Sequence, residues 1–287
     1  MSRMIHASLR PALLAVALAS TTLPSCAQSQ TVQPSQPQTI PPAAAPQAPP
    51  LGLSGSVGLG VATVPRYEGS PNRRTALAPD LTFSYRTADW GHVDLDRNGL
   101  GWTFFDQHEL RAGVLLAGDG GRKDKNTSGA DFASGDDRLR GMGEVRASAE
   151  AGVLVGWGPL GLTYRKSLGQ RGHRGAQVDL NATLPIPVTD AFAISLSAGA
   201  TWADQRYMQA YFGVTPEQSA ASGYAVYTPK AGLRKVDLGL GAEYTLTPAV
   251  KLRANVGAST LGGDAKDSPI VARKTGAVGY VGLYYLF

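Results

Sequence analysis

Hydrophobic and polar residues alternate along most of the chain between positions 51 and 287. Because successive side chains of a β-strand point to opposite faces, this period of two residues predicts strands with one apolar and one polar face. Segment 144–155 shows it clearly: valine and alanine fill the odd positions, while Glu144, Arg146 and Glu150 share the even face. Such charges are costly in a dry core and cost little in a hydrated lumen. The pattern therefore favours a β-barrel with a polar interior over a soluble β-sandwich.

About twelve segments alternate in this way, which predicts an all-β fold: a closed antiparallel transmembrane barrel of about twelve strands. Asn98-Gly99 is a dipeptide favoured in tight hairpin turns, so we read 90–104 as two short strands; if it is not a paired hairpin, the barrel has ten strands. The predicted strands are 51–62, 77–86, 91–96, 100–104, 108–117, 144–155, 160–168, 175–186, 192–202, 236–246, 250–258 and 275–287.

Short and long connections alternate along the chain. In outer-membrane barrels the short turns face the periplasm and the long loops face outward, so the alternation sets the predicted orientation. The short connections are 87–89, 105–107, 156–159, 187–190 and 246–249, and the long ones are 63–75, 118–143, 203–231 and 260–273.

The last strand, 275–287, has Val281, Leu283, Tyr285 and Phe287 on one face, which we expect to contact lipid. Its expected partner is the first strand, so that the cylinder closes. The aromatic ending also resembles the C-terminal signal by which the barrel-assembly machinery recognises outer-membrane proteins.

The N-terminus has the features of an exported protein. Residues 1–27 combine a basic start, an apolar run and a small-residue cleavage motif, which predicts a signal peptide. Leu23-Pro24-Ser25-Cys26 also resembles a lipobox, in which Cys26 would be lipidated and retained. Residues 28–50 are rich in Pro, Gln and Ala, which predicts a disordered periplasmic tail before the barrel, 51–287. The predicted location is the outer membrane of a Gram-negative cell envelope.

The formal charge of +5 does not indicate a nucleic-acid-binding protein, because lysine and arginine are scattered along the chain. Arg73-Arg74 and Arg122-Lys123 instead suggest contact with lipopolysaccharide phosphates. Cys26 is the single cysteine, so the chain can form no internal disulfide bond.

No catalytic or metal-binding motif stands out. His92 shares a strand face with Asp94 and Asp96, but the chain has no HExxH, nucleophile-elbow or P-loop sequence. His173 lies in a short polar loop, where we expect it to be solvated. We therefore predict that the protein is not an enzyme and uses no cofactor or metal.

Five loop motifs, in order along the chain, resemble the MipA/OmpV family of outer-membrane proteins, and the resemblance runs from about Leu51 to Phe287. They are Pro65-Arg66-Tyr67-Glu68-Gly69-Ser70, Leu139-Arg140-Gly141-Met142-Gly143, Tyr207 with Tyr211-Phe212-Gly213-Val214, Ser222-Gly223 with Tyr227, and Asp264-Ala265 with Asp267-Ser268-Pro269-Ile270-Val271.

The resemblance implies an envelope scaffold, because the family's named member interacts with the lytic murein transglycosylase MltA and is proposed to link it to a penicillin-binding protein. Other members are described as adhesins, and a narrow pore or ligand-binding barrel is a further alternative. The motif residues either shape the loops, plug the barrel mouth or contact a partner. We expect the plug for Tyr211 and Phe212.

Overall fold

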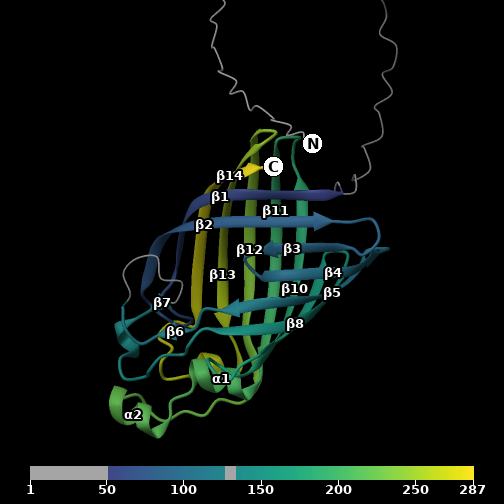
Figure 1. The fold of residues 1–287 in the computed structure, drawn as a ribbon. Helices are drawn as coiled ribbons and strands as arrows, with labels where there is room; N and C mark the ends of the chain where they lie inside the picture. Colours follow the sequence, from purple (N-terminus) through teal and green to yellow (C-terminus); the bar gives the residue numbers. More distant parts are fainter. Residues whose placement is uncertain (1–50, 127–133) are drawn as a thin grey trace, which may run out of the picture. The chain divides into compact units, whose positions relative to one another are not determined.

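The computed structural model describes residues 51–126 and 134–287, which form a closed barrel of twelve antiparallel strands (Figure 1). The predicted fold and strand number are confirmed, including the short hairpin between 92 and 107. The predicted signal peptide, Cys26 and the tail 28–50 lie outside the described residues and stay predictions.

The twelve strands follow one another around the barrel, and each pairs with its neighbours in the chain. They are β1 (Gly52–Pro65), β2 (Arg73–Arg86), β3 (His92–Asp96), β4 (Gly99–Gln107), β5 (Leu110–Asp119), β8 (Ser148–Trp157), β9 (Leu160–Ser167), β10 (Ala176–Pro187), β11 (Phe192–Ala203), β12 (Gly232–Thr247), β13 (Val250–Leu261) and β14 (Thr275–Leu286).

The cylinder closes where β14 pairs with β1, from Ser56 opposite Leu286 to Thr63 opposite Gly279. Backbone hydrogen bonds between Gly55 and Phe287 extend this seam to the last residue. The expected pairing of the first and last strands is confirmed. Four alternate side chains of the last strand are exposed on the outer face: Val281, Leu283, Tyr285 and Phe287.

The outer rim carries the long connections (Figure 1). A two-stranded sheet and four short helices form in them among the described residues: β6 (Arg122–Lys123), β7 (Ser134–Gly135), η1 (Asp137–Leu139), α1 (Gln205–Phe212), α2 (Pro216–Ser222) and η2 (Gly263–Asp267). No helix in the described part of the chain is long and apolar enough to cross a membrane.

Several strand ends differ from those expected, and the start of β8 shows why. β8 begins at Ser148 rather than at 144, because Val145 forms a bridge with Arg122 on β6 and the chain has left the barrel wall there. The expected long connection 203–231 is present, and it contains two helices, α1 and α2. Both helices have side-chain caps, which satisfy backbone amides that a short helix would otherwise leave free.

Candidate functional site

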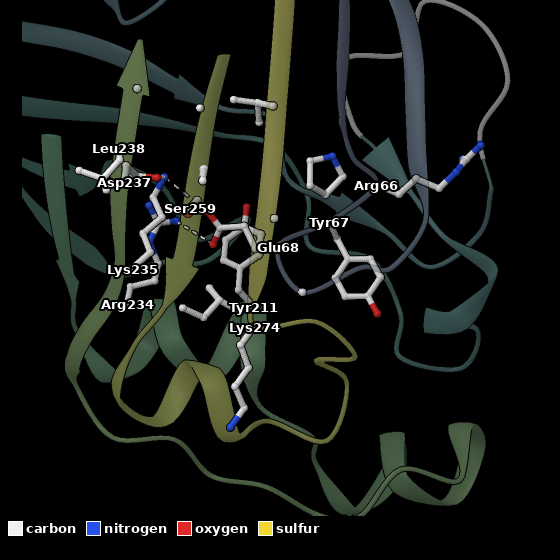
Figure 2. A pocket seen from close by; sticks show the side chains of 18 of the residues that line it. Arg66, Tyr67, Glu68, Tyr211, Arg234, Lys235, Asp237, Leu238, Ser259 and Lys274 are labelled. Carbon is white, nitrogen blue, oxygen red and sulfur yellow. Dashed lines mark hydrogen bonds and ion pairs between the residues drawn. The ribbon is translucent and has the colours of Figure 1, made fainter. Parts of the chain in front are cut away.

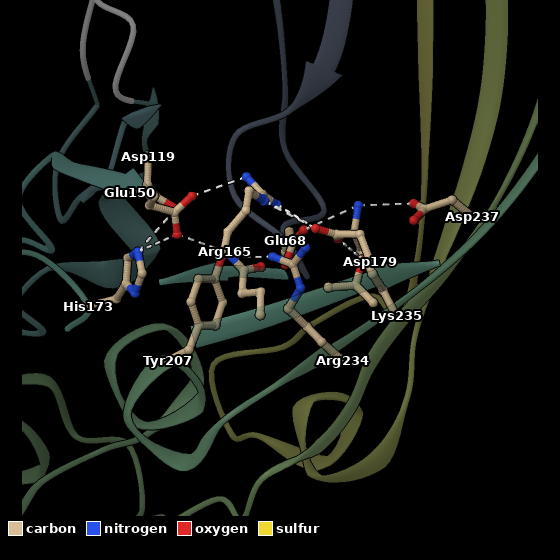
Figure 3. Close-up of polar contacts among 12 residues, drawn as sticks. Glu68, Asp119, Glu150, Arg165, His173, Asp179, Tyr207, Arg234, Lys235 and Asp237 are labelled. Atoms are coloured by element: carbon tan, nitrogen blue, oxygen red, sulfur yellow. Dashed lines mark hydrogen bonds and ion pairs between the residues drawn. The ribbon is translucent and has the colours of Figure 1, made fainter. Parts of the chain in front are cut away.

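A chain of hydrogen bonds and ion pairs runs across the inner faces of four consecutive strands, β8 to β11 (Figure 3). Glu150 on β8 lies 3.1 Å from Arg165 on β9, and Arg165 lies 2.8 Å from Asp179 on β10. The Thr201 hydroxyl on β11 donates to the other Asp179 oxygen at 2.8 Å. We call these four residues the β8–β11 network. Because every charge has an opposite partner, the network can occupy the lumen without exposing an unpaired ion.

His173 extends the β8–β11 network toward the outer rim. The side chain is buried, with 2% of its surface exposed, so the expectation that it would be solvated was wrong. Its Nδ1 accepts a hydrogen bond from the Gly175 amide, and its Nε2 atom lies 3.1 Å from a Glu150 carboxylate oxygen. The ring packs 4.7 Å from the Tyr207 ring of α1. Helix α1 therefore covers a loop that would otherwise face water.

A second polar network lies on the opposite wall of the lumen, where β12 to β14 meet β1 and β2. Arg253 bonds Glu243 at 2.7 Å and lies over the Tyr284 ring, whose hydroxyl donates to Asp80 on β2 at 2.7 Å. Gly58 on β1 makes this reach possible, because a Cβ there would lie 2.6 Å from the Tyr284 ring. These side chains therefore narrow the barrel interior at this level.

Helix α1 closes part of the outer mouth. Asp204 caps its N-terminus, since its carboxylate accepts from the Tyr207 amide at 2.8 Å. Tyr207 and Tyr211 stack with their ring centroids 4.7 Å apart, and the Tyr211 hydroxyl donates to Asp119. Burial raises the pKa of both tyrosines, so their hydroxyls stay protonated donors at neutral pH. The apolar side of α1 is buried: Phe212 is only 1% exposed.

Residues of α1 and of the β1–β2 connection line a cavity of about 730 Å³ (Figure 2). One wall is the inner face of β11 to β14, where serine, asparagine and glycine leave space. Its charged lining residues are Arg66, Glu68, Asp119, Arg122, Arg234, Lys235, Asp237 and Lys274. The size is typical of a small-molecule site.

Arg234 and Lys235 both face this cavity although they are consecutive in β12. Thr201 pairs with Lys235 and Trp202 pairs with Leu233, so Arg234 is an extra residue at a β-bulge. A bulge re-aims a side chain, and here it breaks the alternation that would have placed one of the two outside. The sequence pattern could identify Lys235 as inward-facing, but it carried no signal for Arg234.

Glu68, at the β1–β2 connection, reaches the two cations from the loop. Its carboxylate lies 3.3 Å from Arg234 and 3.8 Å from Lys235. Lys235 also pairs with Asp237 at 3.1 Å. Arg234 additionally donates to the Tyr207 hydroxyl at 2.7 Å, which ties the bulge to α1.

The structure brings the motif segments, distant in sequence, together at the outer mouth. Tyr67 donates to the Ile270 carbonyl at 2.8 Å, and the Gly69 carbonyl accepts from the Ala272 and Arg273 amides.

The other motif residues lie at the ends of elements or in the loops. Pro65 ends β1, and Gly213 and Gly223 are the C-caps of α1 and α2. The Ser222 hydroxyl donates to the Gln218 carbonyl within α2. Asp267 forms an ion pair with Lys274. The Ser268 hydroxyl donates to the Phe212 carbonyl at 2.6 Å, and the next residue, Pro269, is half-buried.

Asp136 joins two of these loops. Its carboxylate accepts hydrogen bonds from the Ser70 hydroxyl at 2.7 Å and from the Asn72 amide group. Burial by itself would raise the pKa of Asp136, but the hydrogen bonds from Ser70, the Arg138 amide and Asn72 outweigh it and hold the pKa below its ordinary value. Tyr67, Leu139, Met142, Val214 and Ile270 form a buried apolar cluster, which we call the loop core.

Contact with lipopolysaccharide would require Arg122 to be exposed, but its side chain is buried. It is 3% exposed, and its guanidinium donates to the Tyr211 carbonyl at 2.6 Å. The bridge between Arg122 and Val145 draws the segment over the barrel mouth, which explains why this expectation was wrong. Arg73 is exposed at the rim and bonds the Ala277 carbonyl at 2.7 Å.

Within residues 51–126 and 134–287, no group of three or more histidine, cysteine or acidic side chains has the arrangement of a metal site. His92 instead contacts Asp94 at 3.2 Å.

The chain resembles one curated protein and several solved structures. A 24 kDa outer membrane protein from Pasteurella multocida is 28% identical over 119 residues, which span 41% of this chain and 46% of that protein. The chain thus matches about half the length of this relative. Among solved structures, an outer membrane channel from Pseudomonas putida F1 has a TM-score of 0.38 at 13% identity, covering 84% of this chain and 97% of the channel. The NanC porin has a TM-score of 0.42 at 10% identity, covering 80% and 98%.

Residues 57–287 match the family described as MltA-interacting protein MipA. The match covers all twelve strands apart from the first residues of β1 and includes every motif segment at the outer mouth. The chain therefore belongs to the MipA family and is an outer-membrane β-barrel protein.

Proposed function

We propose that this protein is a non-enzymatic scaffold of the cell envelope that binds an MltA-like lytic murein transglycosylase and brings it to a penicillin-binding protein. The family description supports a transglycosylase partner. A scaffold is favoured over a wide pore because polar side chains cross the lumen: the β8–β11 network spans one wall, and Arg253, Tyr284 and Asp80 link the other. A twelve-stranded barrel whose lumen is narrowed in this way is better suited to an anchored surface than to a wide channel.

The surface that such a partner could reach from the periplasm is the rim of short turns. Trp90 and Val188 are exposed on two of these turns, at the end of the barrel that also holds Phe287. Aromatic and aliphatic side chains of this kind are common anchors in protein interfaces.

Site-specific photo-crosslinking tests the scaffold directly. A photoreactive amino acid at Trp90 or Val188 should form an adduct with the transglycosylase in intact cells. The same amino acid at Val226, an outer-loop residue of similar exposure, is the matched control and should form none. Two results would contradict the proposal. One is an adduct from Val226 but from neither Trp90 nor Val188, and the other is no adduct from any of the three positions in cells that contain the transglycosylase.

The cavity at the outer mouth favours a second candidate, a ligand-binding barrel, because its volume suits a small solute. Planar-bilayer recording separates this candidate from a pore. We expect the purified protein to give no reproducible single-channel conductance, and steady salt-dependent channels would show that the lumen conducts.

We also infer that the barrel-assembly machinery recognises the final strand through Val281, Leu283, Tyr285 and Phe287, and that lipopolysaccharide contacts the basic rim at Arg73. The exposed apolar face of the last strand supports the first inference, and the exposed guanidinium supports the second.

A further inference from the structure

The cavity at the outer mouth has the features of an anion-binding site. Arg234 is 7% exposed, and its Nε is buried without a hydrogen-bond partner among the described residues. A buried guanidinium with a free donor is costly unless an acceptor reaches it, because it gains neither water nor a full set of protein partners. Lys235 adds a second cation at the same point of the wall.

The bulge in β12 places both residues of this pair on the cavity side of the barrel wall. A regular strand would place one of two consecutive residues on the lipid side, where a charge is strongly unfavourable. The extra residue keeps both Arg234 and Lys235 on the cavity side, and bulges of this kind are frequent next to binding sites. The Tyr207 hydroxyl holds the guanidinium in place at 2.7 Å.

Glu68 shows that the Arg234–Lys235 pair can bind a carboxylate. Its carboxylate bridges the two cations, but it lies on a loop and 39% of its side chain is exposed to solvent. The carboxylate contact at 3.8 Å to Lys235 is loose, so a better-placed carboxylate could replace it. Figure 2 shows the contacts of Glu68 with the two cations.

The rest of the wall offers neutral hydrogen-bonding groups and space. Ser195, Ser197, Asn255 and Ser259 line the cavity from β11 and β13. Gly239 opposite them leaves room, because a Cβ there would meet only the Ser197 hydroxyl at close range. Hydroxyl and amide groups of this kind recognise the hydroxyls of a sugar-like molecule.

We propose that the Arg234–Lys235 pair binds the carboxylate of a small hydroxylated acid, such as a sugar acid, that enters from the outer mouth. Glu68 occupies the carboxylate position while the site is empty and swings away when the ligand binds. The serine and asparagine wall binds the ligand hydroxyls. This inference goes beyond the scaffold function and does not depend on it.

Titration calorimetry of the detergent-purified barrel with glucuronate, glucose and inorganic phosphate tests the proposal. We expect glucuronate to bind, and glucose, which lacks the carboxylate, to bind at least about tenfold more weakly. Arg234→Gln should weaken glucuronate binding at least about tenfold, whereas Glu68→Gln should strengthen it severalfold by removing the competing carboxylate. Gly239→Val should abolish binding by filling the cavity with no change in charge.

Arg111→Gln is the matched control, because it removes one positive charge at the opposite rim, where Arg111 bonds the Gly158 carbonyl. It should bind glucuronate like the wild type. Heat-modifiable gel migration of each variant shows that the barrel is folded. Three results would overturn the proposal: no glucuronate binding by folded wild type and Glu68→Gln protein, equal binding of glucose and glucuronate, or tighter binding of phosphate than of glucuronate.

Discussion

The Glu150 carboxylate on β8 lies 3.1 Å from an Arg165 guanidinium nitrogen on β9, and the Glu150 side chain is fully buried. A buried carboxylate that loses its cation keeps the full cost of its removal from water. The stability of the barrel should therefore depend strongly on Arg165, which pairs with both Glu150 and Asp179.

Arg165→Gln should destabilise the folded barrel by about 3 kcal/mol, at the low end for a buried pair because Arg165 itself is partly exposed. Unfolding in urea, followed by loss of the heat-modifiable band, measures the change in the free energy of unfolding. Arg111→Gln provides the control, since it removes an exposed cation from the rim. Equal effects of the two substitutions would show that the β8–β11 network contributes no more than surface charge.

Helix α1 should lose order when its N-cap is removed. Asp204→Ala deletes the acceptor for the Tyr207 amide, which should cost about 1 kcal/mol and speed hydrogen exchange in 205–212 several-fold. Thr215→Ala, which removes the capping box of α2, should speed exchange in 216–222 instead. Exchange that stays unchanged in both helices would mean that packing alone holds them.

The sequence was sufficient to predict the barrel because lipid on one side and a hydrated lumen on the other impose a strict period of two. Val281, Leu283 and Tyr285 illustrate this, since parity alone identified their face. Arg234 could not be placed in the same way, because a bulge shifts the register without any pattern in the residues around it.

The loops were predicted less well than the strands because their burial depends on tertiary contacts. His173 is surrounded by polar residues in sequence, yet Tyr207 and Glu150 bury it. The helices in 203–231 did leave a local signal: Thr215-Pro216-Glu217-Gln218 has a capping residue, a proline at the first helical position and a glutamine three residues after the cap.

The contact between Asp136 and Ser70 should make the loop core sensitive to acid. Because the folded pKa of Asp136 is lowered, its stabilising effect is fully present above the ordinary aspartate pKa of about 3.9 and is lost as the pH falls through the lower folded value. Asp136→Asn removes this titration. The difference in unfolding free energy between wild type and Asp136→Asn should be constant from pH 7 to about 5 and should shrink below about pH 4.

Unfolding in urea at pH 7, 5, 4 and 3 measures this difference. Asp267→Asn is a suitable control, because Asp267 is exposed and its ion pair is with the exposed Lys274. A difference for Asp136→Asn that is independent of pH would contradict a titrating contact between the loops.

The last strand should matter more for assembly than any exposed loop does. Phe287 closes the seam through backbone hydrogen bonds with Gly55, and its ring packs 5.8 Å from Phe83 on β2. Replacing Tyr285 and Phe287 with serine removes two aromatic side chains from the lipid face at the position that the assembly machinery is proposed to recognise. We expect the outer-membrane level of the double variant to be about tenfold lower than that of the wild type, because polar residues on the lipid face of a barrel are unfavourable.

Val226→Ser is the control, because it removes an exposed apolar side chain from an outer loop without changing any strand. Membrane fractionation and heat-modifiable migration measure assembly of both variants. A folding defect in the purified C-terminal variant would explain low levels without the assembly machinery, so refolding in detergent is measured in parallel. Normal refolding with poor insertion in cells supports recognition of the last strand, and normal insertion of the double variant would rule it out.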